Sequence, residues 1–327
     1  MKDIPTRRRA LQGAVAALLG PAWLTQARAA IYPTRPITVV LPFGAGGSGD
    51  KIVRVMSPNL EKALGQPLLI ESHAGASTNI GTDYVARARP DGYTLLLTGV
   101  PLAVNPSLFK KLSWSMDDLI PISLLSTSPY LLLANNELPV RSMRELLAYA
   151  RQNPGKLSFS TSGSGSGAHM SGALIEQMAG VQLNHVPYKS SQQSLTDVIG
   201  GTVNITFSPL VTSVPLVKAG RIRALAVTSL KRSASVPDIP TIAESGLPGY
   251  EMISWYGVLA PRGTPNEVVQ MLNKAFVGAM KDPAVARALA LDGVELTPGS
   301  PQDFSAFLKR TAATAAEVVK FSGATVD

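Results

Sequence analysis

Short apolar runs that alternate with amphipathic segments are the feature of this sequence that most limits its fold. The runs with the length and composition of β-strands cover residues 37–43, 67–72, 94–99, 119–126, 130–135, 157–162, 184–188, 203–207, 222–229 and 254–261. The segments whose apolar residues recur at helical spacing cover residues 50–64, 79–89, 141–152, 167–179, 191–200, 210–219, 264–281, 283–291 and 301–320. Strands that alternate with helices predict an α/β protein built from βα units.

The first thirty residues have the layout of an export signal. A basic start at Arg7–Arg9 precedes an apolar run over residues 14–24, and Ala27–Ala29 has the A-x-A pattern of a cleavage site. We therefore expect residues 1–29 to direct the protein to the periplasm and to be removed; an N-terminal helix of the fold is the alternative. The arginines also suit a twin-arginine signal, but Ala10 follows them where a bulky residue is usual, so the Sec and twin-arginine routes both stay open.

Charge and cysteine content narrow the functional classes. The segment 1–29 holds five of the 30 Lys and Arg residues and one of the 22 acidic residues, so the net charge falls from +8 to +4 without it. The remaining basic residues are scattered, which argues against nucleic-acid binding, whereas a mild positive balance suits an anionic ligand. The sequence has no cysteine, which excludes thiol catalysis and cysteine-ligated metals.

The chain crosses between two groups of βα units at two places. The first crossing is the apolar stretch 119–135 and the second is the turn-rich stretch 238–261. Division there gives one lobe of residues 30–126 and 252–327, and another lobe of residues 127–251. Because the chain enters the first lobe twice, we expect paired hinge strands with a ligand cleft between the lobes.

A glycine-rich loop near the N-terminus is the main candidate for a ligand site. The stretch LPFGAGGSGDKI, which begins at Leu41, joins an apolar run to a helix-like segment and contains the pattern G-x-G-x-x-G. Its glycines allow close backbone approach, and the helix that begins near Asp50 offers free N–H groups to an anion. That anion is a carboxylate, or the pyrophosphate of a dinucleotide with Glu71 as the ribose-binding acid. A plain turn capped by Asp50 is the third interpretation.

Two further loops join a predicted strand to a helix and would face the same cleft. SHAGASTNIG, residues 72–81, contains Ser77 and Asn79, which either cap the following helix or donate to a ligand. STSGSGSGAHMSG, residues 160–172, would place a second Gly/Ser-rich helix N-terminus opposite the first. Two such helix ends would form a two-sided clamp for an anion, and a flexible linker is the alternative for the second.

A fourth loop and the end of a later strand add polar side chains. In HVPYKSSQQSL, residues 185–195, Tyr188 and Lys189 end a strand. Lys189 either supplies positive charge near the cleft or is an ordinary solvated lysine. Phe207 and Ser208 stand at the mouth of another predicted strand.

Patterns for catalysis and metal binding are missing from the sequence. The histidines His73, His169 and His185 have no metal-ligand spacing, and His169 suits capping or packing better than base catalysis. There is no G-x-S-x-G elbow, and no pair of carboxylates converges on the cleft loops. Loops that offer donors and few acids favour binding over catalysis, without a metal or another cofactor.

These loops resemble those of the Bug-type proteins, the extracytoplasmic solute receptors of tripartite tricarboxylate transporters. The matching pieces extend from about Tyr32 to the C-terminus and include YPTRPITVVLPFGAGGSGD, NIGTDYVARARPDGYTLLLTG, LSFSTSGSGSGAHMSG and KRSASVPDIPTIAESGLPGYE. The resemblance implies a two-lobed, type II-like periplasmic-binding-protein fold that closes on a small carboxylate. It also implies delivery of that ligand, without chemistry, by a monomer to membrane-embedded transporter subunits.

The resemblance also implies which residues bind the ligand. It assigns the first ligand loop to residues 43–50 and the second-lobe loop to residues 160–169, with Gly46–Ser48 holding a carboxylate through backbone groups and ordered waters. The full set of expected ligand-binding residues is Phe43, Gly44, Gly46, Gly47, Ser48, Gly49, Asp50, Ser77, Asn79, Ser162, Ser164, Gly165, Ser166, His169, Tyr188, Lys189 and Ser208.

Three departures from the family pattern bear on the ligand. Gly49 stands where the family usually has Thr, Ser190 where Gly is frequent, and Ser208 where Asp is frequent. Because the missing Asp would have paired with an amino group, we expect a ligand without a cationic amine, such as a di- or tricarboxylate or an aromatic carboxylate. The alternatives are a sensor subunit that presents ligand to a membrane kinase, and an NAD-binding oxidoreductase.

Overall fold

The apolar runs of the sequence form one sheet in the computed structural model, which describes residues 32–44, 46–188, 190–290 and 294–326. The strands are β1 (Ile37–Leu41), β2 (Leu68–Ser72), β3 (Thr94–Gly99), β4 (Leu119–Ala134), β5 (Ser158–Thr161), β6 (Asn184–Pro187), β7 (Ile205–Pro209), β8 (Arg223–Val227), β9 (Ile253–Pro261) and β10 (Glu295–Leu296). The predicted export signal, residues 1–29, lies outside the described residues.

The amphipathic segments form the helices that cover this sheet. They are α1 (Ser48–Leu64), α2 (Asn79–Ala86), α3 (Val100–Leu108), α4 (Met143–Gln152), α5 (Gly167–Ala179), α6 (Ser191–Ile199), α7 (Leu210–Lys218), α8 (Asn266–Met280), α9 (Pro283–Ala290) and α10 (Pro301–Ser322), with 3₁₀ turns η1 (Ala76–Thr78) and η2 (Met116–Asp118). Local sequence sets their ends: Ser142 caps α4, and Ser300 forms a capping box with Asp303 at the start of α10. In the described part of the chain, none of the helices is long and apolar enough to cross a membrane.

Strand β4 connects the two ends of the sheet. The strand order is β2-β1-β3-β9-β4-β7-β5-β6, and β8 and β10 also pair with β4. β4 runs antiparallel to β9 from the pair Leu119 and Pro261 to the pair Pro129 and Ile253, and its later residues pair with β7 and β8. The sequence predicted two separate strands here; the structure has one strand of 16 residues because the polar residues between the two runs continue the ladder with β9.

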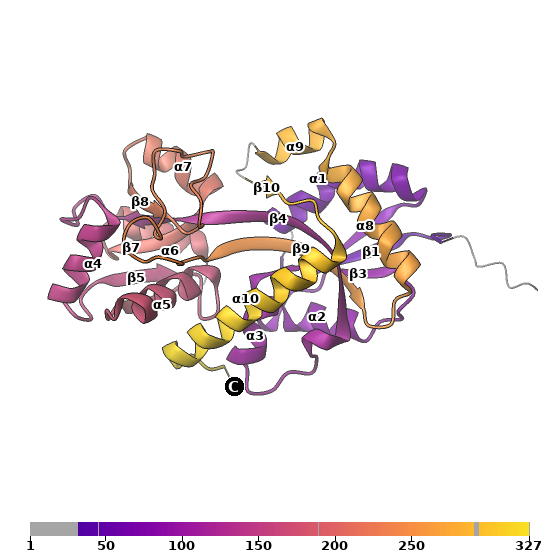
Figure 1. Ribbon diagram of the computed structural model, residues 1–327, viewed down its shortest axis with the longest axis horizontal. Helices are drawn as coiled ribbons and strands as arrows, with labels where there is room; N and C mark the ends of the chain where they lie inside the picture. The colour runs from indigo at the N-terminus through magenta and orange to yellow at the C-terminus, as the bar shows by residue number, and fades with distance from the viewer. Residues whose placement is uncertain (1–31, 45, 189, 291–293, 327) are drawn as a thin grey trace, which may run out of the picture.

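Two groups of βα units therefore lie at opposite ends of β4 and β9 (Figure 1). The parallel strands β1, β2 and β3 form one group with α1, α2 and α3, and the parallel strands β5, β6 and β7 form the other with α5 and α6. Because the carboxyl ends of parallel strands carry the loops that begin helices, each group presents its own set of candidate ligand loops.

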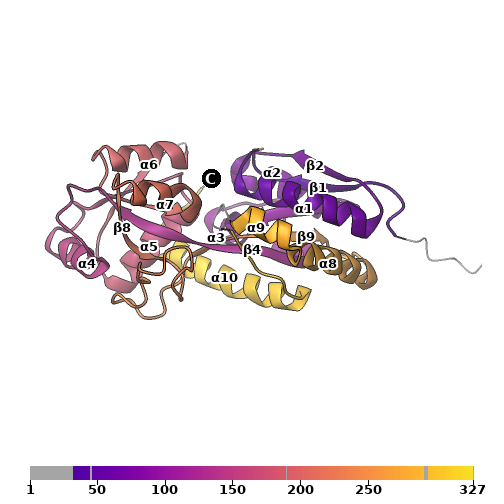
Figure 2. The same ribbon diagram turned by 90° about the horizontal axis from the view of Figure 1, so that it is seen from above.

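Helix α10 crosses the molecule and packs on both groups. Figure 2 shows it on the opposite side of β4 from α6 and α7. Its Phe304 and Phe307 make edge-to-face contacts with Trp255 of β9, with ring centroids 5.8 and 5.6 Å apart. One apolar core cluster contains Phe304, Leu132 of β4 and Phe159 of β5, so the core is continuous from one group to the other on this side.

The tight packing of α10 on β9 predicts opposite effects for two glycine substitutions. Gly257→Ala would place a Cβ about 2.7 Å from Cε1 of the buried Phe304, so we expect a loss of about 1–3 kcal/mol in the free energy of unfolding. Gly278→Ala lies on an exposed site of α8 with open space around its Cβ, so we expect a gain of about 0.5–1 kcal/mol. Urea unfolding of both variants measures these values, and equal changes would contradict the packing described for β9.

Candidate functional site

The first candidate loop joins β1 to α1 and is tied together by Asp50. Helix α1 begins at Ser48, two residues earlier than the sequence suggested. Its N-cap residue is Gly47, which has no side chain to cap the helix. The buried carboxylate of Asp50 accepts hydrogen bonds from the Gly46 N–H (2.8 Å) and from Arg54 Nε (2.7 Å). Asp50 therefore holds the loop in place and is not a plain N-cap, and its carboxylate already has internal donors.

Gly49 is explained by close packing. A Cβ at Gly49 would lie 2.6 Å from Cζ of Phe43 and 2.8 Å from Cε1 of Tyr256, whose rings pack edge to face with centroids 5.9 Å apart. The Tyr256 hydroxyl is hydrogen-bonded with the Gly49 N–H and the Ser48 side chain, and burial raises the pKa of Tyr256. The Thr expected from the family pattern would not fit this packing, so Tyr256 of β9 sets the position of the first turn of α1.

The second Gly/Ser-rich loop joins β5 to α5 and makes an internal hydrogen-bond network. The Ser166 hydroxyl accepts from the His169 N–H (3.2 Å) and donates to the Gly163 carbonyl (2.7 Å). The Gly165 N–H donates to Nδ1 of His169 (3.2 Å). The Ser166 donor is therefore used within the loop, and because Nδ1 of His169 accepts, the ring proton lies on Nε2, which has no hydrogen-bond partner among the described residues.

Two exposed serines of this loop have unused hydroxyls. The side chains of Ser162 and Ser164 are exposed and make no hydrogen bond to any residue that the structure describes. Gly165 lies against α3, because a Cβ there would come 2.5 Å from Cδ2 of Leu108. The loop therefore reaches the first group of βα units, and its two free donors lie beside this contact.

A stack of two imidazoles supports the same loop. The rings of His169 and His185 lie 4.3 Å apart at 25°, and Phe159 stacks on His185 at 4.9 Å. His185 Nε2 is hydrogen-bonded with the Thr161 hydroxyl (2.7 Å). Burial, with a smaller effect of His185, lowers the pKa of His169 to about 4, and burial also lowers the pKa of His185. Both rings are therefore neutral at neutral pH, so the loop offers dipoles and no formal positive charge.

One tyrosine of β4 and one of β9 each pack against one of the two loops. Tyr130 of β4 packs under the first turn of α5, since a Cβ at Gly167 would lie 2.6 Å from Cζ of Tyr130. Burial raises the pKa of Tyr130 to about 12. The sequence analysis missed both tyrosines; their signal was an aromatic residue with a hydroxyl in each of the two predicted hinge strands.

Ser77 and Asn79 of the loop after β2 differ in exposure and in their hydrogen bonds. Ser77 is exposed, and Asn79 Oδ1 accepts from Asn105 Nδ2 (2.9 Å) and Trp114 Nε1 (3.1 Å). Neither of the capping hydrogen bonds considered for this loop forms, because α2 has no side-chain cap at its N-terminus. Ser77 therefore lies in the turn η1, and Asn79 is the first residue of α2, without a capping role for either side chain.

The loop after β6 connects its tyrosine to α6. The Tyr188 hydroxyl donates to Asp197 Oδ2 (2.6 Å), and this hydrogen bond raises the pKa of Tyr188. Ser208 is buried and shares a hydrogen bond with the Thr212 hydroxyl (3.0 Å). Lys189 lies outside the described residues.

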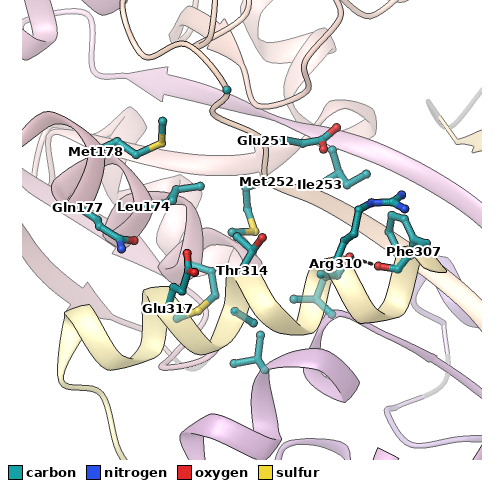
Figure 3. Close-up of a pocket in the computed structure, with 16 residues that line it drawn as sticks. Leu174, Gln177, Met178, Glu251, Met252, Ile253, Phe307, Arg310, Thr314 and Glu317 are labelled. Carbon is teal, nitrogen blue, oxygen red and sulfur yellow. Dashed lines mark hydrogen bonds between the residues drawn. The ribbon is translucent and has the colours of Figure 1, made fainter. Parts of the chain in front are cut away.

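Two pockets differ in their relation to these loops. A pocket of about 180 Å³ is lined by Gly46, Gly47 and Ser48 of the first loop, together with Lys51. The close-up in Figure 3 shows another pocket, of about 460 Å³, between α3, α5 and α10, and it contains none of the predicted ligand-binding residues. The first pocket combines helix N-terminal groups with a lysine, whereas its other walls are Ile52, Leu289 and Val294, and no residue of the second loop lines it.

The chemistry of the candidate site is that of hydrogen-bond donation. The carboxylates of Asp50 in α1 and Asp197 in α6 are both engaged by internal donors. No group of three or more His, Cys, Asp or Glu residues that could hold a metal is found among the described residues. Glu71, the acid of the dinucleotide interpretation, lies in β2, where its carboxylate contacts His73 Nε2 (3.2 Å). The arrangement is suited to a small anion.

Comparisons with known proteins agree with this description. The family model described as "Tripartite tricarboxylate transporter family receptor" matches residues 52–323. Protein BugT of Bordetella pertussis is 35% identical over 296 residues, which cover 90% of this chain and 91% of that protein. The solved structure of R. palustris Rpa4515 with adipate is 38% identical, with a TM-score of 0.79, and covers 90% of this chain and 100% of that one. MatC from Rhodopseudomonas palustris with bound malate is 31% identical, with a TM-score of 0.74, and covers 88% and 100%.

The fold and the donor-rich loops define a periplasmic solute-binding protein. The chain belongs to the receptor family of tripartite tricarboxylate transporters, the TctC or Bug family. The predicted α/β periplasmic-binding-protein fold is thereby confirmed. Members of this family are solute receptors and not enzymes, so the interpretation as an NAD-binding oxidoreductase is not retained.

The buried imidazoles make stability depend on pH. Because the pKa of His169 is about 4 in the folded protein instead of 6.5, the unfolded chain binds a proton between these pH values that the folded chain does not. The stabilisation that comes from keeping His169 neutral is fully present above about pH 6.5 and is lost as the pH falls toward about 4. Across this range we expect the free energy of unfolding to fall by on the order of 2 kcal/mol. Urea unfolding across this range measures it, and His169→Gln is expected to flatten the curve; an unchanged slope in that variant would contradict the assignment.

Proposed function

We propose that this protein captures a small carboxylate without an amino group, a di- or tricarboxylate or an aromatic carboxylate, between its two groups of βα units. The ligand would be delivered to the membrane-embedded subunits of a tripartite tricarboxylate-type transporter. The adipate and malate in the two related structures support this ligand class.

The observation that carries this proposal is the mismatch between donors and acceptors in the loops. Ser77, Ser162 and Ser164 have exposed hydroxyls without partners among the described residues. The carboxylates in or beside the candidate loops are used internally: Asp50 by Gly46 and Arg54, Asp197 by Tyr188, and Glu71 by His73. A carboxylate ligand satisfies donors of this kind, whereas an ammonium group would need a free acceptor.

The two helix ends divide the proposed binding between them. Gly47 and Ser48 at the N-terminus of α1 would hold one carboxylate through backbone N–H groups, which the helix dipole favours. Ser162 and Ser164 beside α5 would hold the other end of the ligand. Of the remaining predicted residues, Phe43, Gly44, Gly46, Gly49 and Asp50 would shape the first loop, and Gly165, Ser166 and His169 the second.

The division into lobes and the cellular setting are part of the proposal. The limits 30–126 with 252–327 for one lobe and 127–251 for the other are supported by the switch of β4 from pairing with β9 to pairing with β7 and β8. Export by the segment 1–29, by the Sec or the twin-arginine route, would bring a monomer to the periplasm, where it meets its transporter.

A thermal-shift screen of the protein tests the ligand class. We expect a shift with at least one of adipate, malate, citrate and benzoate, and none with aspartate, glutamate or NAD. A ligand at about 100 times its dissociation constant stabilises the folded state by about 2.7 kcal/mol, which is easily measured. A shift with aspartate or glutamate alone would contradict the absence of an ammonium acceptor.

A double variant connects the screen to the proposed residues. Removing the hydroxyls in Ser162→Ala/Ser164→Ala is expected to weaken binding of the carboxylate about tenfold or more, because hydrogen bonds to a charged group are lost. The matched control is Ser235→Ala, which removes another exposed hydroxyl in the segment after β8 and should leave the affinity unchanged. Equal affinities for all three proteins would exclude the second-loop serines from the site.

A further inference from the structure

The turn η1 adopts a strained backbone conformation. Its three residues Ala76, Ser77 and Thr78 all have positive φ, at 45°, 51° and 78°. Residues with a Cβ rarely take this left-handed region, and a β-branched residue there is an outlier. Three in succession persist only when contacts from elsewhere in the fold hold them.

Asn105 of α3 supplies such a contact. Its side chain is almost fully buried, and its Nδ2 donates to the Ser77 carbonyl (2.7 Å) and to Asn79 Oδ1 (2.9 Å). One side-chain amide therefore bridges the middle of the turn and the first residue of α2. These partners are 28 and 26 residues away in the chain, so the restraint comes from tertiary structure.

Trp114 fixes the direction of these hydrogen bonds. Its indole N–H can only donate, so the atom of Asn79 that it contacts at 3.1 Å must be the carboxamide oxygen. The oxygen of Asn79 then also requires a donor from Asn105, which directs the Asn105 NH₂ toward the Ser77 carbonyl as well. The NH₂ of Asn79 is left without a partner among the described residues.

Thr78 gives a second sign that the turn is held against its own preference. Its carbonyl accepts from the Thr82 hydroxyl (2.9 Å), but its own Oγ1 is buried without a hydrogen-bond partner in the described structure. A buried hydroxyl without a partner is unfavourable, as is positive φ at a threonine. Local energetics therefore oppose the conformation, and the contacts made by Asn105 and Thr82 maintain it.

We propose that Asn105 is a positioning residue for ligand binding: it holds the strained turn Ala76–Thr78 so that the Ser77 hydroxyl and the Asn79 NH₂ are presented to a ligand carboxylate. This inference rests on the proposed function, because it requires a carboxylate at these loops. Strain that is maintained at a loop is typical of preorganised binding sites, where the cost in stability is offset by tighter binding.

Affinity measurements separate a positioning role from a merely structural one. Titration calorimetry uses adipate, malate, citrate and benzoate. For the carboxylate that the parent protein binds, Asn105→Ala is expected to raise the dissociation constant about tenfold. The matched control is Asn273→Ala in α8, which likewise loses two hydrogen bonds from Nδ2 to the rest of the fold, here to the Ile122 and Gly299 carbonyls (both 2.9 Å). The control should lose stability and keep its affinity; equal affinities for both variants would overturn the proposal.

The strain itself is tested without any ligand. Ala76→Gly should raise the melting temperature, because glycine takes positive φ without cost. The same change at Ala313, an exposed site in α10, should lower it, because glycine disfavours a helix interior. In the Asn105→Ala background the gain from Ala76→Gly should largely disappear, since the turn has already relaxed. An equal gain in both backgrounds would show that Asn105 does not hold the turn.

The two experiments distinguish two kinds of failure. If the parent protein binds none of the four carboxylates but the melting-temperature gain depends on Asn105, the strained turn stands and the proposed function fails. If the parent binds a carboxylate and Asn105→Ala binds it equally well, the function stands and the positioning role is wrong.

Discussion

The antiparallel pairing of β4 with β9 is the contact on which the rest of the structure depends. β4 carries Tyr130 under the first turn of α5, and β9 carries Tyr256 against the first turn of α1. The two helix ends are therefore placed relative to each other by one ladder. Because side chains alternate along a strand, a slip of one residue would turn one tyrosine to the opposite face and separate it from its loop.

Glycine has two distinct uses in these loops. Gly46 has positive φ and open space around it, so its role is conformational, whereas Gly165 combines positive φ with close packing on Leu108. Gly49 and Gly167 have ordinary backbone angles, but a side chain at either would overlap an aromatic ring of the neighbouring strand. A pattern such as G-x-G-x-x-G is thus compatible with several structural causes, which is why the sequence alone left the dinucleotide and carboxylate interpretations open.

The fold and the main loops could be predicted because their signals are local. Apolar period, glycine content and helix starts identify the βα units, and the runs around residues 119–135 identify a crossing. The continuity of β4 through Pro129 could not be predicted, since it depends on pairing with residues more than a hundred positions away. The role of Asn105 is similar, although an amide among the apolar residues of α3 was a signal that could have been used.

The same limit applies to individual site residues. The sequence placed Ser162, Ser164 and His169 in one loop, but only the three-dimensional contacts distinguish free hydroxyls from an imidazole that accepts a backbone hydrogen bond. Tyr188 is comparable, because its hydroxyl is used by Asp197 nine residues later. Residue type and position along the chain define a set of candidates, and hydrogen-bond partners decide between loop structure and ligand contact.

Helix α10 has a consequence for how the molecule can move. It is 22 residues long, is packed on α3, α5 and β4 through one buried stripe, and lies across both groups of βα units. Because α10 holds the two groups of βα units together along one side, they can separate easily only along the opposite side. Access for a solute would thus be one-sided, from the face where α6 and α7 lie (Figure 2).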